Sequence, residues 1–174
     1  MQSNPKVLGE NNATIAQGLS AWKNCIGLGN QAYARGDIAC ARASYEAALY
    51  NICAEMATLT YVPHRSYNHA DWNRERCDNH MAALVVTYHN LADLLIQDGA
   101  PERALEYLCE AQQRIYILLH HPHTEVADLA QRHLQVTYRA LVEFARSHGG
   151  QEKVEQTLLF TRFVCACCVS KIIH

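Results

Sequence analysis

A group of histidine and cysteine side chains in the middle of the chain has the chemistry of a metal site. His64, His69, Cys77 and His80 cluster in and just after a polar segment, and imidazole nitrogens and thiolates are ligands that Zn²⁺ prefers. The step Cys77-x-x-His80 has a spacing that zinc sites use. A solvated loop explains the same residues, so we predict no bound metal and keep zinc binding by these four residues as an alternative.

A second cysteine group lies near the end of the chain. Cys165 and Cys168 would share one face of a helix, and His174 follows. Free cysteine packs as a small hydrophobic residue, so we interpret this group as the packing of a last helix against the core. The other cysteines fall among apolar residues with helical spacing and receive the same interpretation.

Motifs for catalysis are absent from the sequence. It contains no Glu-x-x-His step, no His-Glu-x-x-His, no Gly-x-Ser-x-Gly and no Gly-x-x-x-x-Gly-Lys loop. A cysteine nucleophile assisted by a distant histidine is the catalytic alternative that one sequence leaves open. We predict a protein that is not an enzyme and that needs no cofactor.

The charge balance argues against two classes of partner. Fifteen basic and seventeen acidic residues give a net charge of −2 at pH 7, so no basic footprint favours nucleic acid or an anionic membrane surface. The first residues lack the apolar run of a signal peptide, and no later run reaches the length of a membrane span. We therefore expect a cytoplasmic protein.

Apolar residues recur with helical spacing along most of the chain, which predicts an all-α fold. Six helices are expected, in three antiparallel pairs. The first begins near Ile15, the second follows Asp37, and Asp78 is a plausible N-cap of the third. Breaks come at Gly36-Asp37, at Asp98-Gly99-Ala100-Pro101 and at Gly149-Gly150. We predict one domain over 15–174, with a polar insertion at about 60–77 and a disordered or loosely attached segment 1–14.

The breaks are part of an internal repeat. Gly99 and Gly149 lie fifty residues apart, and Val86-Thr87-Tyr88 matches Val136-Thr137-Tyr138 at the same offset. Starting from Gly36, Ala41 and Ala48 fall where the second pair has Ala104 and Ala111. Small residues at matching places allow two helix backbones to approach closely. The repeat therefore predicts that equivalent helix pairs cross at equivalent small residues.

These residues resemble the tetratricopeptide repeat (TPR) family. The resemblance is carried by Leu28-Gly29-Asn30-Gln31-Ala32-Tyr33-Ala34-Arg35-Gly36-Asp37, followed by Ala41, Tyr45, Ala48 and Leu49. The second pair matches in degenerate form, and the third keeps Tyr138, Leu141 and Gly149 but loses the alanines. The resemblance implies a short TPR-like α-solenoid whose first helices line a concave groove.

The resemblance also implies a function and a set of contacts. We expect a non-catalytic adaptor or scaffold that binds a peptide segment of another protein; a chaperone for secretion substrates is the alternative. A homo-oligomer is also possible. Carried over position by position, the groove contacts are Lys23, Asn30, Tyr33, His89, Asn90, Asp93, Gln97, Arg139, Glu143 and Arg146.

Overall fold

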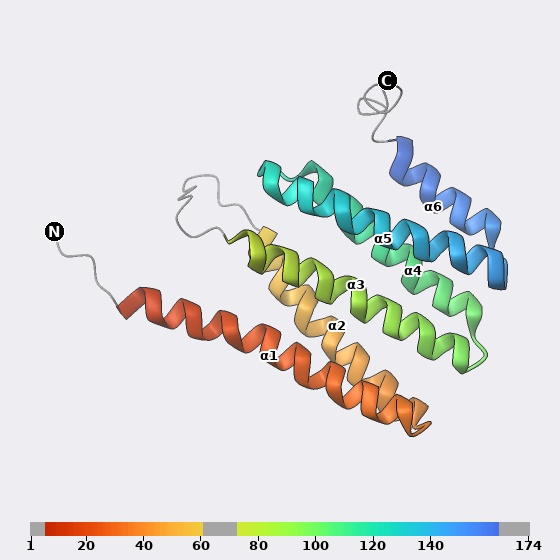
Figure 1. Cartoon of the computed structure of the whole chain (residues 1–174), viewed down its shortest axis with the longest axis horizontal. Coiled ribbons are helices and arrows are strands. Elements are labelled where there is room, and N and C mark those ends of the chain that lie inside the picture. The colour runs from red at the N-terminus through yellow and green to blue at the C-terminus, as the bar shows by residue number, and fades with distance from the viewer. Residues whose placement is uncertain (1–5, 61–72, 164–174) are drawn as a thin grey trace. The chain divides into compact units, whose positions relative to one another are not determined.

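The computed structural model describes residues 6–60 and 73–163, and all regular structure in these two ranges is helical (Figure 1). The all-α prediction is confirmed. The helices are α1 (Lys6–Ala34), α2 (Ile38–Thr60), α3 (Arg74–Gln97), α4 (Pro101–Ile117), α5 (Thr124–His148) and α6 (Gln151–Phe163), with a short 3₁₀ helix, η1 (Leu118–His120), after α4. None of these helices is long and apolar enough to cross a membrane.

The chain forms two compact units, Met1–Asp71 and Trp72–His174. The division falls inside the insertion predicted at about 60–77, and one domain over 15–174 stays a prediction. Helix α1 begins at Lys6, so helix occupies part of the segment 1–14 for which disorder or loose attachment was predicted. Adding turns to a helix that has already nucleated costs little, which explains why the helix extends N-terminally beyond Ile15, the first residue of the apolar pattern.

The first unit is the pair α1–α2, which turns at Gly36. Gly36 has a φ of 75°, a conformation that costs glycine little. The Gly36 N–H donates to the Tyr33 carbonyl (3.0 Å) and the Asp37 N–H to the Ala32 carbonyl (2.9 Å), which is the Schellman pattern. Asp37 then caps α2, because its Oδ1 accepts from the Cys40 N–H at 3.0 Å.

The corner between α3 and α4 repeats this geometry. Gly99 has a φ of 73°; its N–H donates to the Ile96 carbonyl (3.1 Å), and the Ala100 N–H donates to the Leu95 carbonyl (2.8 Å). The corner between α5 and α6 differs, because Gly149 and Gly150 both have positive φ and the Gly149 N–H bonds to Ala145. Two of the three predicted corners are therefore equivalent in detail.

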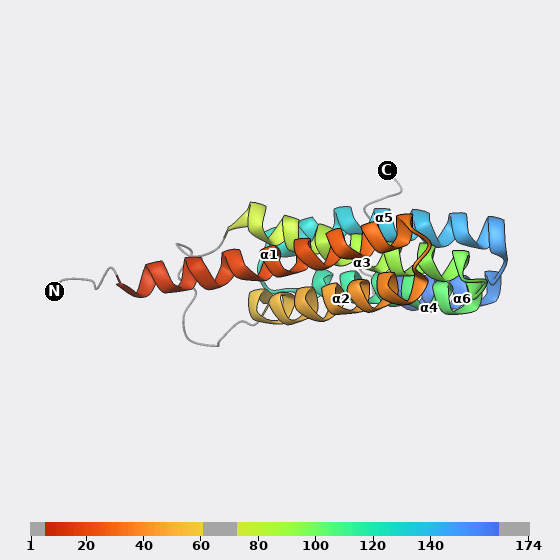
Figure 2. The same ribbon diagram turned by 90° about the horizontal axis from the view of Figure 1, so that it is seen from below.

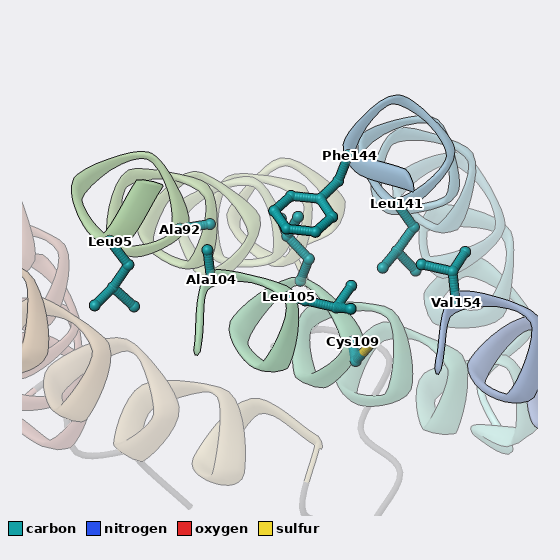
Figure 3. Close-up of a cluster of buried hydrophobic side chains, with 9 residues drawn as sticks. Ala92, Leu95, Ala104, Leu105, Cys109, Leu141, Phe144 and Val154 are labelled. Carbon is teal, nitrogen blue, oxygen red and sulfur yellow. The ribbon is translucent and has the colours of Figure 1, made fainter. Parts of the chain in front are cut away.

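In the second unit, α3 and α5 lie side by side in one layer and α4 and α6 form the other (Figures 1 and 2). The core between the layers is a cluster of buried side chains from all four helices. Its members are Ala92, Leu95, Ala104, Leu105, Leu108, Cys109, Leu141, Phe144 and Val154. Figure 3 shows Ala92 facing Ala104, and Leu141 facing Val154.

Small residues occupy the helix crossings as the repeat predicts. Ala41, Ala48, Ala104 and Ala111 are each at most 1% exposed. In the third pair, Val154 takes the place of Ala104 and is also buried. The sequence pattern therefore identified the packed face of each second helix.

A buried network of hydrogen bonds connects three helices of the second unit. The Thr137 hydroxyl of α5 donates to Gln112 Oε1 of α4, and Gln112 Nε2 lies 3.4 Å from the Thr161 hydroxyl of α6. All three side chains are buried. Because each member supplies a partner to the next, the polar groups are accommodated in the core.

Candidate partner-binding face

The ten predicted contacts are divided between the two units. Lys23, Asn30 and Tyr33 lie on α1, in the first unit. The other seven lie on α3 and α5 of the second unit.

The three contacts on α1 differ in how free they are to bind. Lys23 is exposed and Tyr33 is half-buried. Asn30 is exposed, but its Oδ1 accepts a hydrogen bond from the Tyr45 hydroxyl at 2.8 Å. Asn30 therefore has a structural role in joining α1 to α2, which its predicted role as a contact did not include.

Asp78 aligns α3 with α5. Its two carboxylate oxygens lie 2.7 Å from His133 Nε2 and 3.3 Å from an Arg132 guanidinium nitrogen. The prediction that Asp78 caps α3 is wrong: Asn73 is the N-cap, and its side chain accepts from the Arg76 N–H at 2.9 Å. Asp78 lies one turn inside the helix, where it bonds to a neighbouring helix.

Two exposed valines were missing from the predicted contacts. Val86 on α3 is 42% exposed and Val136 on α5 is 45% exposed. With helical spacing, Val86 shares a face with Asp93, and Val136 shares a face with Glu143. The repeated Val-Thr-Tyr sequence was the signal that could have identified them, because its threonines are buried in both copies and its valines are exposed in both.

These valines and the seven predicted residues of the second unit define what we call the α3–α5 face: Val86, His89, Asn90, Asp93, Gln97, Val136, Arg139, Glu143 and Arg146. On α3, Asp93 and Gln97 are exposed and His89 and Asn90 half-buried; the α5 residues are exposed. Among the residues that the structure describes, Asp93, Arg139, Glu143 and Arg146 form no ion pair. Their charges are therefore available to a ligand.

His89 and Asp93 lie one turn apart on α3 and influence each other. Burial lowers the pKa of His89 below its ordinary value, and the Asp93 carboxylate acts weakly in the opposite direction. Although the Asp93 side chain is exposed, protein atoms keep part of the solvent from its carboxylate, and this burial raises the pKa of Asp93. His89 Nε2 is buried and has no hydrogen-bond partner in the described part of the chain. Burial therefore opposes the charged form of both groups.

The lowered pKa of His89 predicts a pH-dependent stability. Below the ordinary value of about 6.5, the unfolded chain binds a proton at His89 more readily than the folded chain does, so this contribution to stability falls as the pH falls through 6.5. Urea unfolding of the wild type and His89→Gln at pH 7.5, 6.5 and 5.5 measures it. The wild type should lose more stability than the variant on acidification; parallel losses would contradict the assignment.

The opposite layer carries a cleft with a different character. About 550 Å³ of open space between α4 and α6 is lined by Glu106, Cys109, Glu110, Gln113, Arg114, Ile117 and Lys153. Its charges are paired: Arg114 with Glu110 at 3.0 Å, and Lys153 with Glu106 at 3.3 Å. This cleft offers a ligand fewer unsatisfied groups than the α3–α5 face.

The alternative metal site is only partly within the described residues, because His64 and His69 lie outside them. Cys77 and His80 are both buried on α3, and His80 Nδ1 lies 2.7 Å from the Arg76 carbonyl. Burial, with a smaller effect of Asp78, raises the pKa of the Cys77 thiol to about 11, which disfavours the thiolate that binds zinc. No group of three potential ligands occurs in residues that the structure describes.

Within the described residues the protein is all-α and is built of consecutive helix pairs. Helices α3 and α5 carry a face of polar residues with two exposed valines. A family model, DUF2753, described as a protein of unknown function, matches residues 20–169. The chain therefore belongs to the DUF2753 family. No curated protein and no solved structure matches it.

Proposed function

We propose that this protein is a non-catalytic interaction module that binds a peptide segment of another protein on the α3–α5 face. In this proposal the helix pairs form a TPR-like arrangement, and α3 and α5 line its concave side. Two adjacent rows of exposed or half-buried polar residues, each with one exposed valine, suit an extended segment that lies across both helices. A cytoplasmic location and the absence of catalysis belong to the same proposal.

The pair His89–Asp93 is the observation that carries the proposal. Burial disfavours the charged form of each group, and His89 Nε2 has no partner among the described residues. A leucine and an asparagine at these positions would carry neither ionisable group. Ionisable groups with shifted pKa values on an accessible face are typical of functional sites.

Affinity capture with a matched control tests the proposal. The tagged wild type, Arg139→Glu and Arg103→Glu are compared by quantitative mass spectrometry of the proteins they retain. Arg103 is an exposed residue of α4, so its variant makes the same charge change on the other layer. We expect Arg139→Glu to recover the specific partner roughly tenfold less well, and Arg103→Glu to recover it normally. Equal recovery by all three would contradict the proposal.

A further inference from the structure

We propose that the partner segment places a basic side chain against Asp93 and an acidic group against Arg139 and Arg146. This inference rests on the proposed function. It assigns a direction to the bound segment, because its basic end must lie over α3 and its acidic end over α5.

The α3 half of the face leaves one negative charge without compensation. Asp93 has no ion pair among the described residues, and the charged group that acts on its pKa is His89, one turn earlier. Because burial keeps His89 neutral near pH 7, the imidazole does not cancel the charge of Asp93. The α3 half is therefore acidic at its centre.

A partner that covers Asp93 also removes water from its carboxylate. An unpaired carboxylate withdrawn from water costs several kcal/mol, so a partner that binds here must supply a cation or hydrogen-bond donors. Arginine meets the need best, because its planar guanidinium has five N–H donors and can bind a carboxylate through two of them. Lysine supplies the charge without the second parallel bond.

The α5 half has the opposite sign. Arg139 and Arg146 lie two helical turns apart on one face, and Glu143 lies between them. All three are exposed, and none forms an ion pair with a described residue. Two arginines and one glutamate leave one net positive charge, so the same desolvation argument requires an acidic group from the partner.

The two exposed valines give the α3–α5 face an apolar component besides its charged groups. Val86 and Val136 add apolar surface to the α3 and α5 rows. A segment with a small apolar centre and opposite charges at its ends would match the whole face. The reversed segment would put like charges together, which costs several kcal/mol in an interface.

Selection from a displayed library of random peptides of about twelve residues tests the inference without knowledge of the natural partner. The wild type should enrich peptides with arginine or lysine at one position and aspartate or glutamate at another. Asp93→Lys should lose the basic preference and retain the acidic one. Arg139→Glu combined with Arg146→Glu should do the reverse. Glu155→Lys, an equal charge change at an exposed residue of α6, is the control and should select like the wild type.

The outcomes separate the inference from the function on which it rests. Peptides selected without charge preference, or an unchanged basic preference in Asp93→Lys, would overturn the inference and leave peptide binding intact. Failure of the wild type to enrich any peptide would overturn both. A loss of basic preference in Glu155→Lys as well would assign the effect to net charge, which also overturns the inference.

Discussion

Gly29→Leu is expected to unfold the α1–α2 pair. Gly29 is buried, and a Cβ added there would collide with the ring of Tyr45 on α2. The Tyr45 side chain cannot move aside, because it is 3% exposed and its hydroxyl donates a hydrogen bond to Asn30. Overpacking of a core typically costs about 1–3 kcal/mol, and a leucine here adds three more carbons beyond the first collision.

The equivalent positions in the second unit indicate a second substitution that should compensate for the loss of Gly29. There the core contains Ala92 on α3 and Leu108 on α4, in place of Gly29 and Tyr45. Gly29→Ala alone should lower the melting temperature, whereas Gly29→Ala with Tyr45→Leu should recover part of the loss, although it gives up the bond to Asn30. Circular dichroism melting of the wild type and the three variants measures these differences. A Gly29→Leu protein that melts like the wild type would refute the assigned crossing.

Ala104→Trp is expected to unfold the second unit. Ala104 is fully buried at the crossing of α4 with α3 and faces Ala92 (Figure 3). An indole cannot fit there unless the two helices separate, so the loss should exceed the ~1–3 kcal/mol usual for overpacking. Arg103→Trp, at the exposed neighbouring position, is the control and should melt within a few degrees of the wild type. Retained helicity and melting temperature in Ala104→Trp would contradict the packing.

Most of the fold could be predicted from the sequence because local rules determine it. Gly36 and Gly99 end helices with the same hydrogen-bond pattern, and glycine followed by a capping or helix-starting residue is a local signal. Ala41 and Ala104 are buried where helical spacing places them. Such features need no knowledge of distant contacts.

The errors come from features that depend on neighbours. The sequence repeat equates Leu28 with Leu91, yet Leu28 is 58% exposed and Leu91 is 1% exposed. Both leucines have the same place in the repeat, but their burial depends on what packs against each helix. Asp78 was predicted as a cap because aspartate is common there; its bonds to Arg132 and His133 involve residues more than fifty positions away.

The sequence could predict which helices carry the candidate contacts, but it could not predict the pKa shifts or hydrogen bonds of these residues. The repeat placed His89, Asp93 and Arg139 on helices that share one layer. It did not show that burial shifts the pKa of His89 and Asp93, because solvent exclusion depends on the packed structure. Nor did it show that Asn30 is bonded to Tyr45, since that contact requires both helices of the pair.

Site-specific photocrosslinking reports which layer of the second unit contacts the partner, and so distinguishes the α3–α5 face from the layer of α4 and α6. A photoreactive amino acid is introduced at Val86 of the α3–α5 face or at Gln113, an exposed residue of α4 in the other layer. Binding on the α3–α5 face predicts a discrete crosslinked partner from Val86 and none from Gln113. A crosslink from Gln113 with none from Val86 would contradict it.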